Sequence, residues 1–86
     1  MSKEIDEYKK KAEQGDAEAQ CSLGDCYRLG QGVEQNYSES FKWYQLSARQ
    51  GNSVAQLYLG VLYDEGLGVE QNNELAVDWY RKSADQ

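Results

Sequence analysis

The sequence predicts an all-α fold in which short antiparallel helices stack side by side as a solenoid. Residues 15–50 match residues 51–86 at 17 of 36 positions without a gap. Apolar residues within each copy recur at helical spacing, as Ala19, Leu23 and Tyr27 do. A glycine-containing loop separates two such stretches in each copy. A unit of helix, loop and helix cannot bury its apolar face alone, so units of this kind stack on their neighbours.

The first expected helix covers residues 3–14 and forms half of a repeat. Ile5, Tyr8 and Ala12 have the same spacing as the apolar residues near the end of each complete copy. This spacing places the three side chains on one face of a helix. We therefore expect a half repeat followed by two complete repeats.

The first helix of each complete repeat is expected at residues 17–29 and again at 53–65. Asp16 is a favourable N-cap residue, and Gly30 stands where a helix commonly ends in a left-handed residue. Gly24 lies inside the helix, where glycine costs roughly 1 kcal/mol relative to alanine. Both copies have this glycine, so we expect two helices to approach closely there, with large aromatic side chains packed against it.

The second helix of each complete repeat is expected at residues 37–50 and 73–85. It follows the loop Gly-x-Gly-Val-Glu-Gln-Asn, whose glycines permit positive φ angles. Asn36 is followed three residues later by Glu39, a pattern that resembles a capping box. The chain is thus expected to contain five helices.

Composition limits the functions that the chain can have. Its 86 residues are enough for one domain with a modest core. The absence of histidine excludes Ser-His-Asp and Cys-His nucleophile systems and the usual zinc site. A net charge of −6 makes nucleic acid a poor partner and suits a basic protein partner. We therefore expect a protein that is not an enzyme and binds no cofactor.

The two cysteines indicate the cellular compartment. Cys21 and Cys26 are five residues apart, which is too far along a helix for a disulfide. We interpret both as reduced thiols, which favours a cytoplasmic location. No apolar run is long enough to span a membrane, and the charged first residues lack the apolar stretch of a signal peptide. A membrane partner is therefore not expected.

The residues that both copies share carry a family resemblance. The pattern Ala-Gln-x-x-Leu-Gly-x-x-Tyr-x-x-Gly-x-Gly-Val, followed by Trp-Tyr-x-x-Ser-Ala, resembles the Sel-one-like repeat (SLR), a relative of the tetratricopeptide repeat. The resemblance implies one SLR domain over residues 1–86, with a half repeat at 1–14 and repeats at 15–50 and 51–86. It also implies a right-handed, tetratricopeptide-like α/α superhelix of about five antiparallel helices. Members of this family act mostly as adaptors and scaffolds.

The positions at which the two copies differ are free to specialise. On the outer side of the first helix, the first copy is polar and the second copy is apolar. The apolar residues are Val54, Leu57 and Val61, with Tyr58 alongside. An apolar face of this kind needs a cover. Three covers remain open: a further repeat of a longer chain, a second copy in a homo-oligomer, or a different protein.

These differences predict a protein-binding surface. The candidate anchors are Val54, Leu57, Tyr58, Val61, Trp43 and Trp79, and the charged residues expected to orient a partner are Asp25, Asp64 and Glu65. The predicted function is a non-catalytic protein–protein interaction module, an adaptor or scaffold that binds a partner helix or peptide. Two alternatives stay open. One is a small acidic inhibitor or immunity protein that blocks a basic enzyme or toxin, and the other is a self-stacking structural fragment of a longer repeat array.

Overall fold

The helices lie where the repeat pattern predicts them. The computed structural model describes residues 3–86, and this range contains five helices and no strand. The helices are α1 (Lys3–Glu13), α2 (Ala17–Leu29), α3 (Tyr37–Arg49), α4 (Ser53–Glu65) and α5 (Asn73–Ala84). Each end agrees with the expected one to within one residue. The all-α fold class is therefore confirmed.

The helix ends follow from capping residues in the sequence. The side chains of Asp16 and Asn36 accept hydrogen bonds from backbone N–H groups three residues later, at 3.0 and 3.1 Å. Asn52 and Asn72 do the same for α4 and α5, at 2.9 and 3.0 Å. Each bond satisfies an N–H group that has no partner within its own helix. Gly30 ends α2 in the left-handed region, with a φ of 70°.

The glycines inside α2 and α4 permit the close helix approach that the sequence predicts. A Cβ atom on Gly24 would lie 2.7 Å from the ring of Tyr44, and one on Gly60 would lie 2.8 Å from the ring of Tyr80. Real Cβ atoms do not approach other atoms this closely. The two repeats therefore use the same aromatic-on-glycine contact to join their paired helices.

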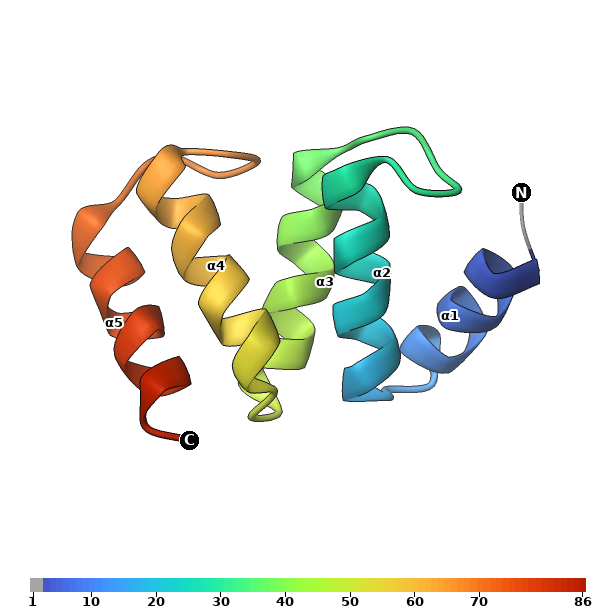
Figure 1. The fold of residues 1–86 in the computed structure, drawn as a ribbon, viewed down its shortest axis with the longest axis horizontal. Helices are drawn as coiled ribbons and strands as arrows, with labels where there is room; N and C mark the ends of the chain where they lie inside the picture. Colours follow the sequence, from blue (N-terminus) through green and yellow to red (C-terminus); the bar gives the residue numbers. More distant parts are fainter. Residues whose placement is uncertain (1–2) are drawn as a thin grey trace.

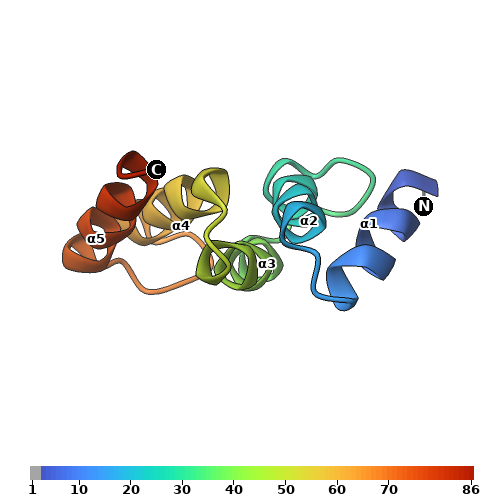
Figure 2. The same cartoon turned by 90° about the horizontal axis from the view of Figure 1, so that it is seen from below.

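The five helices form an elongated array. Each helix packs against its neighbours along the chain, and the molecule measures 37 × 24 × 15 Å (Figure 1). The loops at residues 30–36 and 66–72 lie at one edge of the array, and the short turns lie at the opposite edge. Figure 2 shows α3 on the side of the array opposite to α2 and α4. Among the described helices, the backbone of α2 also comes close to that of α4, whereas the backbone of α3 comes close to neither α1 nor α5, so the array curves toward its α2–α4 side.

Polar side chains shared by both repeats fix the helix pairs. The Ser47 hydroxyl donates a hydrogen bond to the carbonyl of Ala17 at 2.6 Å, and the Ser83 hydroxyl donates to that of Ser53 at 2.8 Å. Both bonds join the last turn of the second helix to the first turn of the first helix. The identical pair explains why each copy needs serine at this position.

A shared glutamine joins each repeat to the preceding helix. Gln20 Nε2 donates to the carbonyl of Ala12 at 3.0 Å, and Gln56 Nε2 donates to that of Ala48 at 3.1 Å. Both glutamines are buried. These bonds add a second donor to carbonyl groups at the C-terminal ends of α1 and α3, which also accept from the backbone N–H groups of Gly15 and Gly51.

The cysteines are part of the packing. Cys21 and Cys26 are free thiols, and both are buried. Burial, with a contribution from Asp25, raises the pKa of Cys21 to about 11, so the thiol stays protonated near neutral pH. Within residues 3–86 no helix is both long and apolar enough to cross a membrane.

Candidate functional site

An apolar stripe runs along the exposed side of α4. Val54 and Leu57 are 48% and 43% exposed, and Val61 is partly exposed. Asp64 and Glu65 follow at the C-terminal end of the helix, and both are exposed. The structure therefore places these five predicted residues on one helix, with apolar side chains along its length and carboxylates at its end.

The equivalent stripe of α2 is covered in the same molecule. Cys21 is the counterpart of Leu57, and its side chain is only 6% exposed because α4 lies over it. Glu18, the counterpart of Val54, stays exposed. One repeat thus shows which part of this stripe a neighbouring helix buries.

Tyr58 belongs to the contact between the two repeats. Its ring stacks on that of Tyr44, with centroids 5.6 Å apart and planes 18° apart. The guanidinium carbon of Arg28 lies 4.0 Å from the centroid of the Tyr58 ring, in a cation–π contact. Tyr58 is half-buried and already used within the fold. We therefore omit it from the surface offered to a partner.

Asp25 is also used within the fold. It accepts a short hydrogen bond from the Tyr44 hydroxyl and forms an ion pair with Arg28, at 3.5 Å. Arg28 Nε donates to the same hydroxyl oxygen at 2.9 Å. Burial and the bond to Asp25 raise the pKa of Tyr44 well above its usual value. Asp25 therefore holds α3 against α2 in addition to any contact with a partner.

The surface continues onto α5, which the sequence analysis missed. Val77 is 44% exposed, and Tyr80 and Ala84 lie on the same side of the helix. The Tyr80 hydroxyl donates to Asp64 at 3.4 Å, which joins α5 to the end of α4. The signal was present in the repeat alignment. The counterparts of these α5 residues are Phe41, Tyr44 and Ala48, the residues of α3 that α4 covers.

The two tryptophans have packing roles. Trp43 is buried with Ala12, Ala19 and Leu23, so its ring joins α3 to the helices before it. Trp79 is partly exposed and packs against the core that α3 and α4 form. Lysine ammonium groups cover one face of each ring. We therefore omit Trp43 from the candidate surface.

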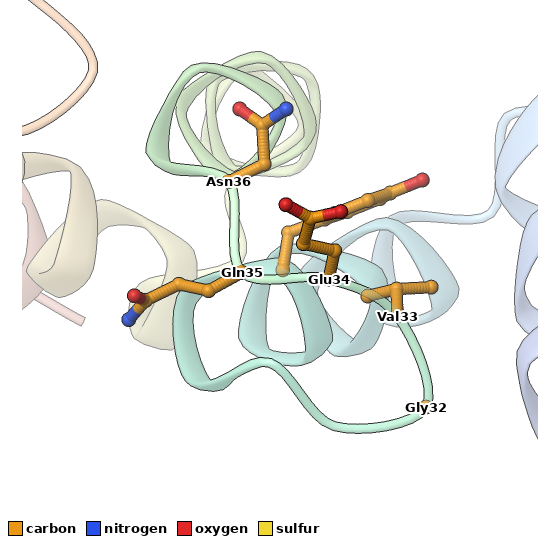
Figure 3. A pocket seen from close by; sticks show the side chains of 6 residues that line it. Gly32, Val33, Glu34, Gln35 and Asn36 are labelled. Carbon is orange, nitrogen blue, oxygen red and sulfur yellow. The ribbon is translucent and has the colours of Figure 1, made fainter.

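The loop before α3 forms a surface hollow with structural polar groups. Figure 3 shows the side chains of Glu34, Gln35 and Asn36 around it. Gln35 Nε2 donates to the carbonyl of Arg28 at 2.8 Å, and Asn36 caps α3. These groups hold the loop against α2 and α3. In the part of the chain that the structure describes, no group of three or more acidic or cysteine side chains is placed to hold a metal ion.

Comparisons with known proteins agree with this geometry. The family described as Sel1 repeat matches residues 17–52 and 53–86. No curated protein matches the chain at a significant level. The repeat boundaries at 15–50 and 51–86 stay a prediction.

Two solved structures are similar over almost the whole chain. One is the crystal structure of c5321, a protective antigen present in uropathogenic Escherichia coli strains and displaying an SLR fold. Its sequence is 41% identical to this chain over the matched residues, and the TM-score is 0.94. The match covers 95% of this chain and 18% of that one. A Sel1 repeat protein from Oxalobacter formigenes is 41% identical with a TM-score of 0.91, over 94% of this chain and 33% of its own. The chain thus spans a third or less of either protein.

Sel1 repeats are typically non-catalytic scaffolds that mediate protein interactions. The family match and the likeness to SLR structures agree with the aromatic-on-glycine contact that both repeats share. The chain belongs to the Sel1 repeat family.

Proposed function

We propose that this chain is a non-catalytic protein-binding module that binds an amphipathic partner helix on the outer faces of α4 and α5. The proposed α4–α5 surface consists of Val54, Leu57, Val61, Val77, Tyr80 and Ala84. The observation that carries the proposal is the internal duplication. A helix covers this surface on α2 and α3, and the same surface recurs on α4 and α5 with exposed apolar residues.

The surface of α2 and α3 that α4 covers indicates which side chains a partner of α4 and α5 would present. On α2 and α3, the helix α4 contributes Tyr58 over Tyr44 and small and branched apolar residues into the core. Tyr63 packs edge-on against Phe41, with ring centroids 5.4 Å apart. A partner helix for α4 and α5 is expected to present a similar mixture of aromatic and aliphatic anchors, because helices bind grooves through residues spaced three and four apart.

Charge restricts the partner further. Asp64 and Glu65 lie at one end of the surface, and Glu74 and Asp78 lie beside Val77. These carboxylates favour a helix with lysine or arginine at its flanks. Rim charges of this kind mainly raise the association rate and select the orientation, whereas the buried apolar anchors supply most of the affinity.

A stapled helical peptide tests the proposal. The probe keeps the inward-facing residues of α4 and carries lysine at its other positions, and the staple is needed because a free 13-residue helix is marginal in water. Fluorescence anisotropy should show binding to the wild type. Leu57→Glu and Val77→Glu should each weaken it by about tenfold or more, because each places a charge in an apolar contact.

Leu46→Glu is the matched control. Leu46 is an exposed leucine on α3, outside the α4–α5 surface, and the substitution adds the same charge. It should leave binding unchanged. Equal binding by all four proteins, or no binding by the wild type, would contradict the proposal.

Self-association is the second candidate function, favoured by the same exposed apolar residues. A homo-oligomer that stacks through this surface should dissociate on Leu57→Glu in analytical ultracentrifugation, whereas the Leu46→Glu protein should not. A monomeric wild type removes this candidate.

The inhibitor function remains a proposal as well, and a steep loss of affinity for a basic enzyme with added salt would support it. The free thiols of Cys21 and Cys26 support the cytoplasmic location that we propose.

A further inference from the structure

Two contacts between successive repeats use equivalent positions but are filled differently. In the contact between α3 and α4, position 58 is tyrosine and position 62 is leucine, and both side chains pack in the core region. In the contact between α1 and α2, the equivalent positions hold Ser22 and Cys26. The smaller side chains cannot fill the same space. The α1–α2 contact is therefore expected to hold a larger hollow than the α3–α4 contact, where a cavity of about 270 Å³ lies beside Tyr58 and Leu62.

The structure contains this hollow. A surface cavity of about 460 Å³ lies between α1 and α2. Ile5, Tyr8 and Cys26 provide apolar walls, and Glu4, Ser22 and Asp25 provide polar ones. Figure 1 shows α1 diverging from α2 toward its N-terminal end. Ile5 and Cys26 are almost fully buried, so the cavity reaches down to the packed interior of this contact.

The cavity is acidic. Two carboxylates line it, from Glu4 and Asp25, and no lysine or arginine is among its lining residues. Burial raises the pKa of the Cys26 thiol, and the charges of Asp25 and Glu4 raise it further. Both carboxylates therefore act on the same point at the cavity wall. A neighbouring hollow shares Tyr8 and Ser22 and is lined by three further carboxylates and one lysine.

Arg28 on α2 shows which group this fold places beside the equivalent tyrosine. Its guanidinium lies over the Tyr58 ring of α4 and donates to the hydroxyl of Tyr44 on α3, while it pairs with Asp25 on its own helix. Tyr44 is the counterpart of Tyr8. This fold thus places the guanidinium of Arg28 beside Tyr44, and the carboxylate of Asp25 beside both. The same tyrosine in the α1–α2 contact faces a cavity with two carboxylates.

We propose that the α1–α2 cavity binds an arginine side chain from a partner peptide. The aliphatic part of the side chain packs against Ile5 and Tyr8, and the guanidinium lies between Glu4 and Asp25. Arg28 and Tyr44 contact Oδ1 of Asp25, and Oδ2 is its second acceptor. This site lies on different helices from the α4–α5 surface, so either proposal can fail without the other.

Nuclear magnetic resonance titration tests the site directly. The probe is N-acetyl-arginine methylamide, which presents the side chain as a peptide does. Its matched control is N-acetyl-citrulline methylamide, which has nearly the same shape and no charge. Arginine should shift the backbone amide signals of Ser22, Cys26 and Gln31 in a saturable way, and citrulline should bind at least tenfold more weakly.

Two cavity variants locate the binding. Ser22→Tyr introduces the residue that the next repeat has at this position and should fill the cavity, lowering arginine affinity by about tenfold or more. Glu4→Gln removes one carboxylate and should lower it by about threefold, the size expected for an exposed ion pair. Leu46→Glu, a charge added at an exposed leucine away from the cavity, should leave arginine affinity unchanged. If the Ser22→Tyr protein does not keep the helicity of the wild type, Cys26→Leu takes its place. This substitution introduces leucine, the residue that the next repeat has at the equivalent position 62.

Saturable shifts at the cavity that need the charge and disappear in the filled variant support the site. Equal binding of arginine and citrulline, shifts that survive filling of the cavity, or no shift with arginine would each overturn it. Neither the α4–α5 peptide nor its variants enter this experiment, so its outcome is independent of the proposed function.

Discussion

The two complete repeats have the same backbone arrangement and different surroundings. Tyr44 in the first repeat is 0% exposed, whereas its counterpart Tyr80 is only half-buried. Cys21 is buried, whereas Leu57 is exposed. The first repeat lies between two neighbours, and the second has one neighbour within the described residues. Burial in this fold therefore depends on the adjacent repeat as much as on the residue.

The hydrogen-bond networks differ in the same way. In the first repeat, the tyrosine hydroxyl lies between Asp25 and Arg28. In the second, these two positions hold Val61 and Asp64, and the Tyr80 hydroxyl donates to Asp64 over 3.4 Å. The first repeat thus has a closed internal network of both charges. The second has an apolar residue and a carboxylate, which suits a contact with another molecule.

The largest difference between the repeats should appear when the equivalent tyrosines are removed. Tyr44→Ala should lower the free energy of unfolding by about 3–5 kcal/mol, because it leaves a cavity between Gly24 and Tyr58. Tyr80→Ala should cost less than half as much, since the ring is already partly solvated. Urea denaturation followed by circular dichroism measures both. Equal losses would show that the second repeat is as tightly packed as the first.

The helices could be predicted from the sequence because their determinants are local. Capping by Asp16 and Asn36 and the left-handed Gly30 fix helix ends within a few residues of the chain. The close approach at Gly24 was also predictable, since only contact explains a glycine at the same place inside two helices. Fold class and helix bounds therefore needed no long-range information.

The site was harder to predict because it depends on which helix covers which face. Helical spacing placed Val54, Leu57 and Val61 on one exposed stripe, and the structure agrees. Spacing alone could not show that Tyr58 faces back toward Arg28, because that contact joins different repeats. It also could not supply the α5 half of the surface. A stripe on one helix becomes a surface only when the crossing of two helices is known.

A smaller effect should separate the two interior glycines. Alanine at either position gains roughly 1 kcal/mol of helix propensity but introduces a Cβ within 2.8 Å of a tyrosine ring. Tyr44 is held by Tyr58 and cannot retreat, so Gly24→Ala should lower the free energy of unfolding by about 1–2 kcal/mol. Tyr80 can turn outward, but the Cβ would still lie 3.2 Å from the carbonyl oxygen of Ala76, so Gly60→Ala should cost less than Gly24→Ala without being neutral. Thermal unfolding of both proteins measures the difference, and a larger loss at Gly60 would contradict the proposed freedom of Tyr80.

The last effect concerns the dependence of stability on pH, and it tests whether the buried face of the first repeat is as dry as its packing indicates. The pKa of Cys21 rises from 9.0 to about 11 on folding, because burial disfavours the thiolate. Below pH 9 the thiol is protonated in both states, and its contribution to stability is fully present. Between pH 9 and 11 the unfolded chain loses this proton first, so the free energy of unfolding should fall as pH rises.

Cys21→Val isolates that contribution, since valine fills similar space without titrating. Urea denaturation at pH 8 and at pH 10.5 should show a loss of stability in the wild type that is smaller in the variant by about 1–2 kcal/mol, given 1.36 kcal/mol per pKa unit. The remaining loss belongs to groups such as Tyr44, whose pKa burial also raises. Leu57→Cys is the matched comparison, because it places a thiol at the equivalent exposed position. Its thiol should ionise near the usual pKa in both states and leave the pH dependence unchanged, whereas a steeper dependence would indicate that the α4 stripe is covered in solution.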